Sequence, residues 1–497
     1  MVTARIPRLP EVASFLAEDP LKFCVGGEWV ASASKMTFQT RDPGTGEVLA
    51  EVYAGDQPDI ESAVGAAGEA FSRSGWATLS ANERGVFLHR LADLVEKQKS
   101  VLAQLESLDC GKILAHAEGD VQVFIDTLRY FTQISLSTKH HIPLAVSGHD
   151  AYTSLQPYGV CAFIFPWNFP ILLNGWGISP ALAAGNTVVI KPAEDTPLST
   201  LYLARLAGEA GIPDGVINVV TGFGETAGAA LSRDSRIKRM SFTGSPEVGK
   251  LVARACGENL VPVKLELGGK GAAVVFDDVD VDDTATKLVQ AVTFHTGQVC
   301  CTATRWLIHE SIYDRVVELS AAQMGQIRVG NPQSEGTEMG PVVSEKQRDR
   351  VLGYLEKGKK EGAEFVVHGG PASVEGFENG FYVKPAMMAG TPDNVSCREE
   401  IFGPVTYCMS FSDEDQAIEL VNRSNYGLAN SVWTSDRTRA QRVAESMVAG
   451  NSWINAHNVF PLGVPYGGVN LSGLGGGVNS PETYLDYLRP QSVVRPL

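Results

Sequence analysis

Apolar and polar positions alternate in blocks along residues 159–269. Five short runs rich in Val, Ile and Phe show little polar alternation, which is typical of parallel strands covered on both faces. These predicted strands are GVCAFIF (159–165), NTVVI (186–190), INVVTG (217–222), KRMSFTG (238–244) and VKLELGG (263–269). Helical stretches separate them at 171–185, 196–212 and 245–260. Strand and helix in strict alternation imply right-handed βαβ units, so we predict a doubly wound α/β domain with ligands at the carboxyl ends of its strands.

The hydrophobic pattern predicts different structure on either side of this domain. Residues 60–134 read mostly as amphipathic helix, and 135–157 as a polar, β-prone segment. A second alternation of strands and helices runs from about 270 to 467, and the Gly-rich stretch 465–482 predicts a loop. Residues 151–190 carry no charged side chain and no His, but Pro and Gly divide them into pieces too short to span a bilayer. We interpret that block as the buried centre of the first domain.

Composition and charge narrow the class of protein. A chain of 497 residues suggests about three domains, or two large ones. The 41 basic and 57 acidic side chains give a net charge of −16, which argues against nucleic-acid or anionic-membrane partners. The N-terminal stretch has no apolar segment of the kind that a secretory signal needs. Eight cysteines without a C-x-x-C spacing predict neither disulfides nor a metal site, and a cytoplasmic location fits best.

Polar residues follow several predicted strands, and each has an ordinary explanation beside a functional one. Asn168 is costly in apolar surroundings unless its amide serves a turn or donates to an oxyanion. Lys191 and Glu194 suit ribose hydroxyls, or else form a solvated pair in a loop. Ser245 would cap a helix that has Pro246 at its first position. That arrangement is either a plain helix start or a site for a phosphate.

Four further motifs are equally open when taken alone. Gly222–Ala227 matches G-x-G-x-x-A, but it lies at the third βα turn, so a tight turn explains it as well. Glu266 either pairs with a cation or is a carboxylate with a raised pKa that can act as a base. Cys300 is an inert core thiol or a nucleophile, and 399–404 is a turn or a ligand contact.

In combination the motifs carry a family resemblance. From about Phe23 to its C-terminus the chain resembles the hydrolytic, NAD(P)-dependent aldehyde dehydrogenase superfamily, with PWNFP, KPAE, FTGSPEVG, ELGGK, GQVCC, EEIFGP and PYGG in that order. The resemblance implies an α/β fold of three parts and a homodimer or homotetramer. The parts are a Rossmann-like doubly wound cofactor domain (1–134 and 158–268), an α/β catalytic domain (269–467) and a small β oligomerisation segment (135–157 and 468–497).

The resemblance also implies a reaction and the residues that perform it. An aldehyde is oxidised to the carboxylic acid, because addition of a thiolate first gives a tetrahedral carbon from which hydride can leave. Cys300 takes the place of the nucleophile. The Asn168 amide and the Cys300 backbone N–H would hold the oxyanion. Glu266 would activate the water that hydrolyses the thioester.

For the cofactor, the resemblance places two residues, Lys191 and Glu194, on the adenosine ribose and Ser245 on the pyrophosphate. Glu400 and Phe402 would contact the nicotinamide riboside. Because Glu194 should repel a 2′-phosphate, NAD is favoured over NADP. The remaining residues expected at the cofactor are Phe165, Trp167, Gly224 and Gly268.

The substrate tunnel implied by the resemblance is apolar and aromatic. Its expected lining is Val123, Phe169, Leu173, Trp176, Phe294, Val299, Cys301, Phe460 and Tyr466. An aliphatic or aromatic aldehyde suits such a lining, and a trimethylammonium aldehyde would also sit against its rings. The choice between these substrates stays open at this point.

One departure from the family pattern and two alternative functions complete the picture. Many relatives carry Arg-Glu where this chain has Gly476 and Gly477, which leaves Glu266 as the only obvious base. A CoA-acylating semialdehyde dehydrogenase usually lacks the glutamate of the ELGGK motif, so Glu266 argues against that activity. A silent structural protein on the same fold is disfavoured because Cys300, Glu266 and Asn168 are all present.

Overall fold

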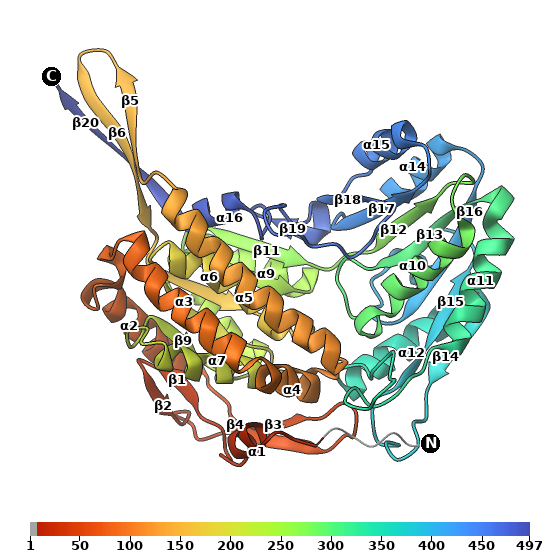
Figure 1. The fold of residues 1–497 in the computed structure, drawn as a ribbon, viewed down its shortest axis with the longest axis horizontal. Helices are drawn as coiled ribbons and strands as arrows, with labels where there is room; N and C mark the ends of the chain where they lie inside the picture. Colours follow the sequence, from red (N-terminus) through yellow and green to blue (C-terminus); the bar gives the residue numbers. More distant parts are fainter. Residues whose placement is uncertain (1–6) are drawn as a thin grey trace.

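The computed structural model describes residues 7–497. The first six residues, part of the stretch expected to lack a secretory signal, lie outside this range. Two α/β regions lie side by side, and a long β arm projects from the N-terminal one (Figure 1). Among the described residues, no helix has the length and apolar character needed to cross a membrane.

The first region is built on an eight-stranded sheet. Its five central strands are parallel and are those that the hydrophobic pattern predicts, while β1 and β19 pair antiparallel to its two edges. In spatial order the strands are β19 (Gly473–Leu474), β11 (Val263–Leu267), β10 (Arg239–Gly244), β7 (Val160–Ile164), β8 (Thr187–Lys191), β9 (Ile217–Val219), β1 (Phe23–Val25) and β2 (Glu28–Val30). The chain runs outward from β7 to β9 and then returns to β10, which confirms the doubly wound prediction. The switch point, where ligands bind in such sheets, therefore lies at the carboxyl ends of β7 and β10.

Helices cover both faces of this sheet. Right-handed crossovers place α6 and α7 on one face and α9 on the other, where α8 and α2 pack beside it. α3, α4 and α5 form a further layer over α6 and α7 (Figure 1). The helices of this region are α1 (Pro10–Leu16), α2 (Gln57–Arg73), α3 (Ala81–Lys97), α4 (Lys99–Cys110), α5 (Leu114–Ser137), α6 (Pro170–Ala183), α7 (Leu198–Glu209), α8 (Ala229–Arg233), α9 (Pro246–Glu258) and α16 (Pro481–Leu485). The helical stretch predicted over 60–134 is thus four helices, with a break between α3 and α4 at Gln98.

The second region contains a seven-stranded sheet, in agreement with the second predicted alternation. Its strands, in spatial order, are β14 (Glu364–Pro371), β15 (Val383–Ala389), β16 (Val405–Phe411), β13 (Ala303–His309), β12 (Gly271–Val275), β17 (Ala429–Trp433) and β18 (Asn451–Ile454). All pairings are parallel except that of β14 with β15. Its helices are α10 (Val281–Thr293), α11 (Tyr313–Gln326), α12 (Glu345–Lys360), α13 (Val395–Arg398), α14 (Glu414–Asn422) and α15 (Arg437–Ser446).

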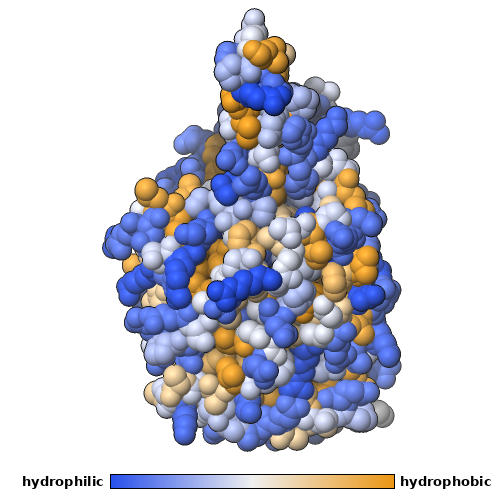
Figure 2. Space-filling view, turned by 90° about the vertical axis from the view of Figure 1, so that its left-hand side faces the viewer, coloured by the Kyte–Doolittle hydropathy of each residue, from blue (hydrophilic) through white to orange (hydrophobic). Residues whose placement is uncertain are grey.

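The projecting arm is a three-stranded antiparallel sheet of β5 (His141–Val146), β6 (His149–Pro157) and β20 (Leu488–Pro496). Figure 2 shows apolar side chains on the arm where it stands clear of the body. A separate two-stranded sheet pairs β3 (Thr37–Arg41) with β4 (Val48–Tyr53). The chain between 468 and 497, grouped with the arm by the predicted boundaries, also supplies β19 to the first sheet. The domain boundaries themselves stay predictions.

Candidate active site

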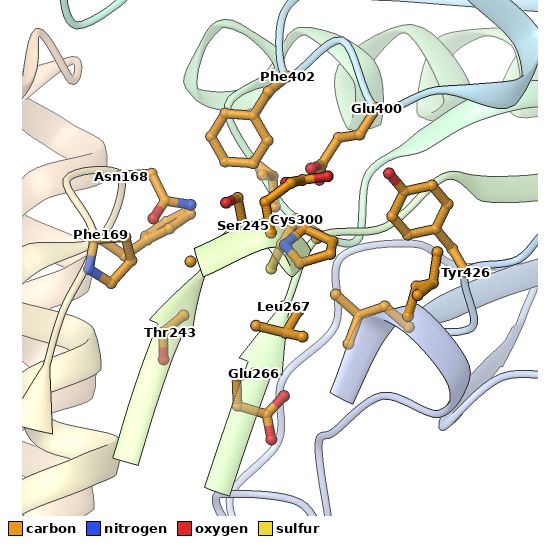
Figure 3. Close-up of a pocket in the computed structure, with 18 of the residues that line it drawn as sticks. Asn168, Phe169, Thr243, Ser245, Glu266, Leu267, Cys300, Glu400, Phe402 and Tyr426 are labelled. Carbon is orange, nitrogen blue, oxygen red and sulfur yellow. The ribbon is translucent and has the colours of Figure 1, made fainter. Parts of the chain in front are cut away.

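A cavity of about 1010 Å³ opens at the switch point of the first sheet. Its walls come from the loops that follow β7, β10 and β11, and from the second region through the residues around 300, 400 and 466. Figure 3 shows side chains from these separate segments gathered around one space. The fold therefore brings Asn168, Glu266 and Cys300, the three predicted catalytic residues, to the wall of one cavity.

Cys300 lies in the loop that precedes β13, and its side chain is half-buried at the cavity wall. Its Sγ is 3.3 Å from the Tyr466 hydroxyl. Hydrogen bonding from the Cys301 and Tyr466 side chains lowers the pKa of the Cys300 thiol, against the opposing effect of burial. Since the thiolate is the reactive form, these contacts favour Cys300 as a nucleophile over an inert core thiol.

Cys301 differs from its neighbour. It was predicted to line the cavity, but it is not part of the cavity wall. It is fully buried, and its Sγ lies 3.5 Å from Asn458 Oδ1. Burial raises the pKa of the Cys301 thiol well above its ordinary value. The two cysteines share a turn, so the Cys301 thiol lies close enough to hydrogen-bond with the Cys300 thiol, while only Cys300 is part of the cavity wall.

Asn168 follows β7 and precedes α6, and its side chain is buried. Its Nδ2 donates to the Gln298 carbonyl at 3.0 Å, which ties the β7 loop to the Cys300 loop. Gln298 is fixed in turn, because its Oε1 accepts from the Val343 backbone N–H at 2.9 Å. An amide NH₂ has two donors, so one N–H of Asn168 remains for a ligand. Sequence reasoning did not find Gln298.

Glu266 is the fourth residue of β11 and is buried. Neither of its carboxyl oxygens has a hydrogen-bond partner among the described residues, so the predicted alternative of a pairing with a cation is wrong. Burial raises the pKa of Glu266 well above its ordinary value, although Lys264 opposes the shift. In Figure 3 the Glu266 carboxyl points back along β11 rather than toward Cys300. No hydrogen bond has to break when this side chain turns.

The cofactor contacts predicted at the carboxyl edge of the sheet are present only in part. Ser245 caps α9 by accepting from the Val248 backbone N–H at 3.3 Å, and Pro246 takes the first helical position as predicted. Lys191 lies behind the cavity wall, 2% exposed, and its Nζ is 3.1 Å from Glu194 Oε2. A fully solvated pair is therefore excluded. The residues of the predicted cofactor set that line the cavity are Phe165, Trp167, Glu194, Ser245, Gly268, Glu400 and Phe402.

Gly224 does not line the cavity either, in contrast to its predicted cofactor role. It is exposed at the start of a π-helical turn, Gly224–Gly228. Gly222, the first glycine of the same motif, packs closely on Gly55. A Cβ at 222 would lie only 2.5 Å from the Gly55 carbonyl oxygen, so a side chain has no room there. The tight-turn explanation of the G-x-G-x-x-A match is thus the correct one for Gly222.

Backbone contacts hold the Glu400 side chain at the cavity wall. Its Oε1 accepts from the Gly269 N–H at 2.9 Å, and a Cβ at Gly268 would lie 2.1 Å from its Oε2, so a side chain at 268 would displace the Glu400 carboxyl group. Burial raises the pKa of Glu400 to about 7. The Arg350 guanidinium donates to the Glu400 carbonyl at 2.6 Å, a contact that the sequence did not predict. Phe402 has a φ of +63°, which is strained for a side chain of its size.

The apolar end of the cavity carries the predicted aromatic lining. Trp176 contacts Phe460 and Tyr466, with ring centroids 5.9 and 5.3 Å apart. The predicted tunnel residues on the cavity wall are Phe169, Leu173, Trp176, Val299, Phe460 and Tyr466. Val123 and Phe294 pack against this cluster from behind and are not part of the wall.

Comparison with known proteins matches this architecture to one family. The model of the aldehyde dehydrogenase family matches residues 29–493. The chain is 42% identical over 475 residues to cytosolic aldehyde dehydrogenase 1 of Mus musculus, covering 94% of each chain. It is 40% identical over 470 residues to the mitochondrial aldehyde dehydrogenase of Homo sapiens, covering 92% of this chain and 89% of that one.

Solved structures agree with these relatives. The NAD⁺ complex of an aldehyde dehydrogenase from Bacillus cereus superposes with a TM-score of 0.96 at 38% identity, covering 99% of this chain and 100% of that one. Betaine aldehyde dehydrogenase from Staphylococcus aureus in complex with NAD⁺ superposes with a TM-score of 0.95 at 33% identity, covering 98% and 97%.

Proposed function

The chain belongs to the aldehyde dehydrogenase family, and from this premise we propose that it oxidises an uncharged aldehyde to the carboxylic acid with NAD. One observation carries the proposal: a thiol with a lowered pKa, a free amide donor and an unpartnered carboxyl group share one cavity wall. The solved relatives from Bacillus cereus and Staphylococcus aureus are NAD⁺ complexes, which supports the choice of cofactor.

The residues at the carboxyl edge of the sheet fit a dinucleotide. The N-terminus of α9 faces the cavity with Thr243, Ser245 and Glu247 on the wall, and helix N-termini suit a pyrophosphate. Glu194, 35% exposed beside Lys191, is placed to accept from ribose hydroxyls and to repel a 2′-phosphate. Glu400 would contact the riboside of the nicotinamide end. Bound NAD supplies the acceptor for a hydride.

The protein's own groups would act in two stages. First, the Cys300 thiolate adds to the aldehyde carbon, and the oxyanion is held by the free N–H of Asn168 and the backbone N–H of Cys300. One such donor is worth on the order of 3–4 kcal/mol in the transition state. Loss of hydride leaves a thioester on Cys300. Glu266 then takes a proton from water as the water oxygen attacks the thioester, and the acid leaves as the Cys300 thiolate is restored.

The substrate end of the cavity favours a neutral aldehyde. Its wall is made of aromatic and aliphatic side chains, and burial raises the pKa of the nearby Glu266 carboxyl group, which disfavours its charged form. A cation entering this end would have its positive charge desolvated with only ring faces as partners. Aliphatic and aromatic aldehydes are therefore the proposed substrate class, ahead of trimethylammonium aldehydes.

The test is an aldehyde panel with NAD and with NADP, followed by NADH or NADPH absorbance. We expect a higher kcat/KM with NAD, and a higher one for hexanal or benzaldehyde than for betaine aldehyde. Cys300→Ala should abolish turnover, whereas the matched control Cys301→Ala should retain most of it because Cys301 is fully buried and is not part of the cavity wall. Turnover by Cys300→Ala, or NADP use equal to NAD use, would overturn the assignment.

We also propose that the chain is a cytoplasmic homo-oligomer that assembles through the arm, with the domain boundaries predicted above. Ile142, Leu144 and Val146 on β5 are 38–45% exposed, an unusual apolar edge for a monomer. All eight cysteines are free, which fits a reducing compartment. Light scattering of the wild type against a Leu144→Glu variant tests the assembly, which should dissociate if the arm forms the contact.

A further inference from the structure

A buried general base has to return its proton to solvent before the next turnover. Glu266 has no hydrogen-bond partner for either oxygen among the described residues, and the neighbouring Gly477 offers no side chain. The question is therefore which groups of this chain connect the Glu266 carboxyl with water outside the protein.

A stripe of polar side chains runs along the sheet from Glu266. Lys264 and Glu266 lie two positions apart on β11, so they share one face of the sheet. In the parallel register with β10, Ser241 pairs with Lys264 and Thr243 pairs with Glu266, which places all four on that face. Ser241 and Thr243 line the cavity, so the cavity continues along the stripe behind Glu266. The space there is polar enough to hold hydrogen-bonded water.

Lys264 ends the stripe and connects it to the surface. Its side chain is fully buried, and its Nζ lies 2.6 Å from Asp486 Oδ2. Asp486 follows α16 and is 33% exposed. The other charged group near this pair is Arg239 on β10, whose Nη2 is 3.7 Å from Asp486 Oδ2. Burial lowers the pKa of Lys264, and Arg239 adds to the shift, although Asp486 and Glu266 oppose it. Lys264 can therefore exchange a proton more readily than an ordinary lysine.

Two glycine residues lie beside both ends of the stripe, Lys264 and Glu266. Lys264 Nζ donates to the Gly477 carbonyl. A Cβ at Gly467 would lie 2.6 Å from the Gly477 Cα and 3.2 Å from Glu266 Oε1. The Glu266 carboxyl and the Gly477 backbone thus both lie next to Gly467, and no side chain at 467 separates them.

We propose that Lys264 and Asp486 carry the proton that Glu266 accepts from the hydrolytic water out to solvent, an inference that rests on the proposed function. The Lys264 ammonium first passes a proton to the Asp486 carboxylate, which releases it to bulk water. The neutral Lys264 amine then accepts, through water beside Ser241, the proton held by the Glu266 carboxyl group, which is turned back along β11 (Figure 3). One proton moves from water to solvent, and no electron pair leaves the protein. Lys264 and Asp486 act through Glu266, so they are positioning residues rather than catalytic ones.

The test follows the acyl adduct on Cys300 over successive turnovers, using rapid quenching and mass spectrometry with excess benzaldehyde and NAD. In Asp486→Asn and Lys264→Met the adduct should form at the wild-type rate and, from the second turnover on, decay about tenfold more slowly, a smaller loss than the roughly 10²–10⁴-fold expected for the base itself. Added imidazole should restore the decay rate in proportion to its concentration, because a small buffer can replace a proton relay but not a structural contact. Asp282→Asn breaks a surface ion pair with Arg315 and serves as the matched control, with unchanged decay.

Three outcomes contradict the relay. Unchanged adduct decay in both variants would overturn it, and so would slow decay that imidazole does not relieve. A loss of adduct formation together with decay would make the pair structural. Asp486→Asn is isosteric and partly exposed, so it keeps the inference testable if Lys264→Met does not fold. If the wild type forms no adduct at all, the proposed function fails, and that result is separate from the result for the relay.

Discussion

Two buried lysines lie on opposite sides of the active site, and their pKa values are shifted in opposite directions. Lys112, between α4 and α5, is fully buried between Glu106, at 3.2 Å, and Asp120. Burial alone would lower its pKa, but Asp120 and Glu106 raise the pKa of Lys112 above its ordinary value. Lys264 has one ion-pair partner, Asp486, and burial lowers its pKa. The number of carboxylates in direct contact with a buried ammonium group, and any cation beside it, decide whether the group is a fixed charge or can exchange a proton.

The two surroundings serve different parts of the site. Lys112 lies over the Phe169 ring at 4.0 Å, and Glu106 accepts from the Ile171 backbone N–H at 3.0 Å. Its cluster therefore fixes the segment that carries Asn168, and it is closed to solvent. The Lys264 pair opens to solvent through Asp486 and meets Glu266, whose oxygens have no partners. We infer that the paired charges of the Lys112 cluster set the geometry of Asn168, the oxyanion donor. The Lys264 pair and the unpartnered Glu266 carboxyl group instead serve proton transfer.

The largest effect is expected from Lys112→Met. It leaves Glu106 and Asp120 buried without a cation, which typically costs about 3–5 kcal/mol. Reversible denaturant unfolding should show that loss in the free energy of unfolding. Simultaneous replacement of all three residues by apolar ones should recover most of it. A Lys112→Met protein within about 1 kcal/mol of wild type would remove the contrast with Lys264.

A second effect should appear in the dependence of stability on pH. Because the folded-state pKa of Glu266 is raised, its protonated form is the one that the fold accommodates, and the wild type loses stability as pH rises above the unfolded pKa. Glu266→Gln removes that loss, so its advantage over wild type should grow as pH rises from the unfolded-state pKa of about 4.3 toward the raised folded-state pKa, by roughly 1.4 kcal/mol per unit of pKa shift. Unfolding curves across this range provide the measurement. A difference that does not change with pH would mean that Glu266 ionises freely in the folded protein.

The smallest effect is expected from Lys264→Met in the same unfolding measurement. Asp486 is partly exposed and keeps Arg239 at 3.7 Å, so its charge returns to water at little cost, below about 1 kcal/mol. A stability loss as large as that of Lys112→Met would show that both lysines are structural. The comparison between them would then fail.

The sequence predicted the elements of the first sheet because those signals are local, whereas the three catalytic candidates followed from the family resemblance that the motifs carry together. Apolar runs define strands, and strand ends meet at one edge whatever the rest of the chain does. What it missed depends on contacts between distant segments, such as Asn168 with Gln298, Lys264 with Asp486, and Arg350 with the Glu400 carbonyl. The misplacement of Cys301 has the same origin, since the direction of a side chain in a loop follows from the packing around it. Lys191 and Gly224 follow their motifs but lie outside the cavity wall.

The most direct test of the account is the fate of the acyl group in Glu266→Gln. Mixed with benzaldehyde and NAD at pH 9, this variant should release a burst of NADH up to one equivalent per active site and then turn over about 10²–10⁴-fold more slowly than wild type. Mass spectrometry should find the acyl adduct on a peptide that contains Cys300, and Cys300→Ala should show neither burst nor adduct. Steady turnover by Glu266→Gln within about tenfold of wild type, without an adduct, would contradict the assignment of Glu266 as the base that hydrolyses the thioester.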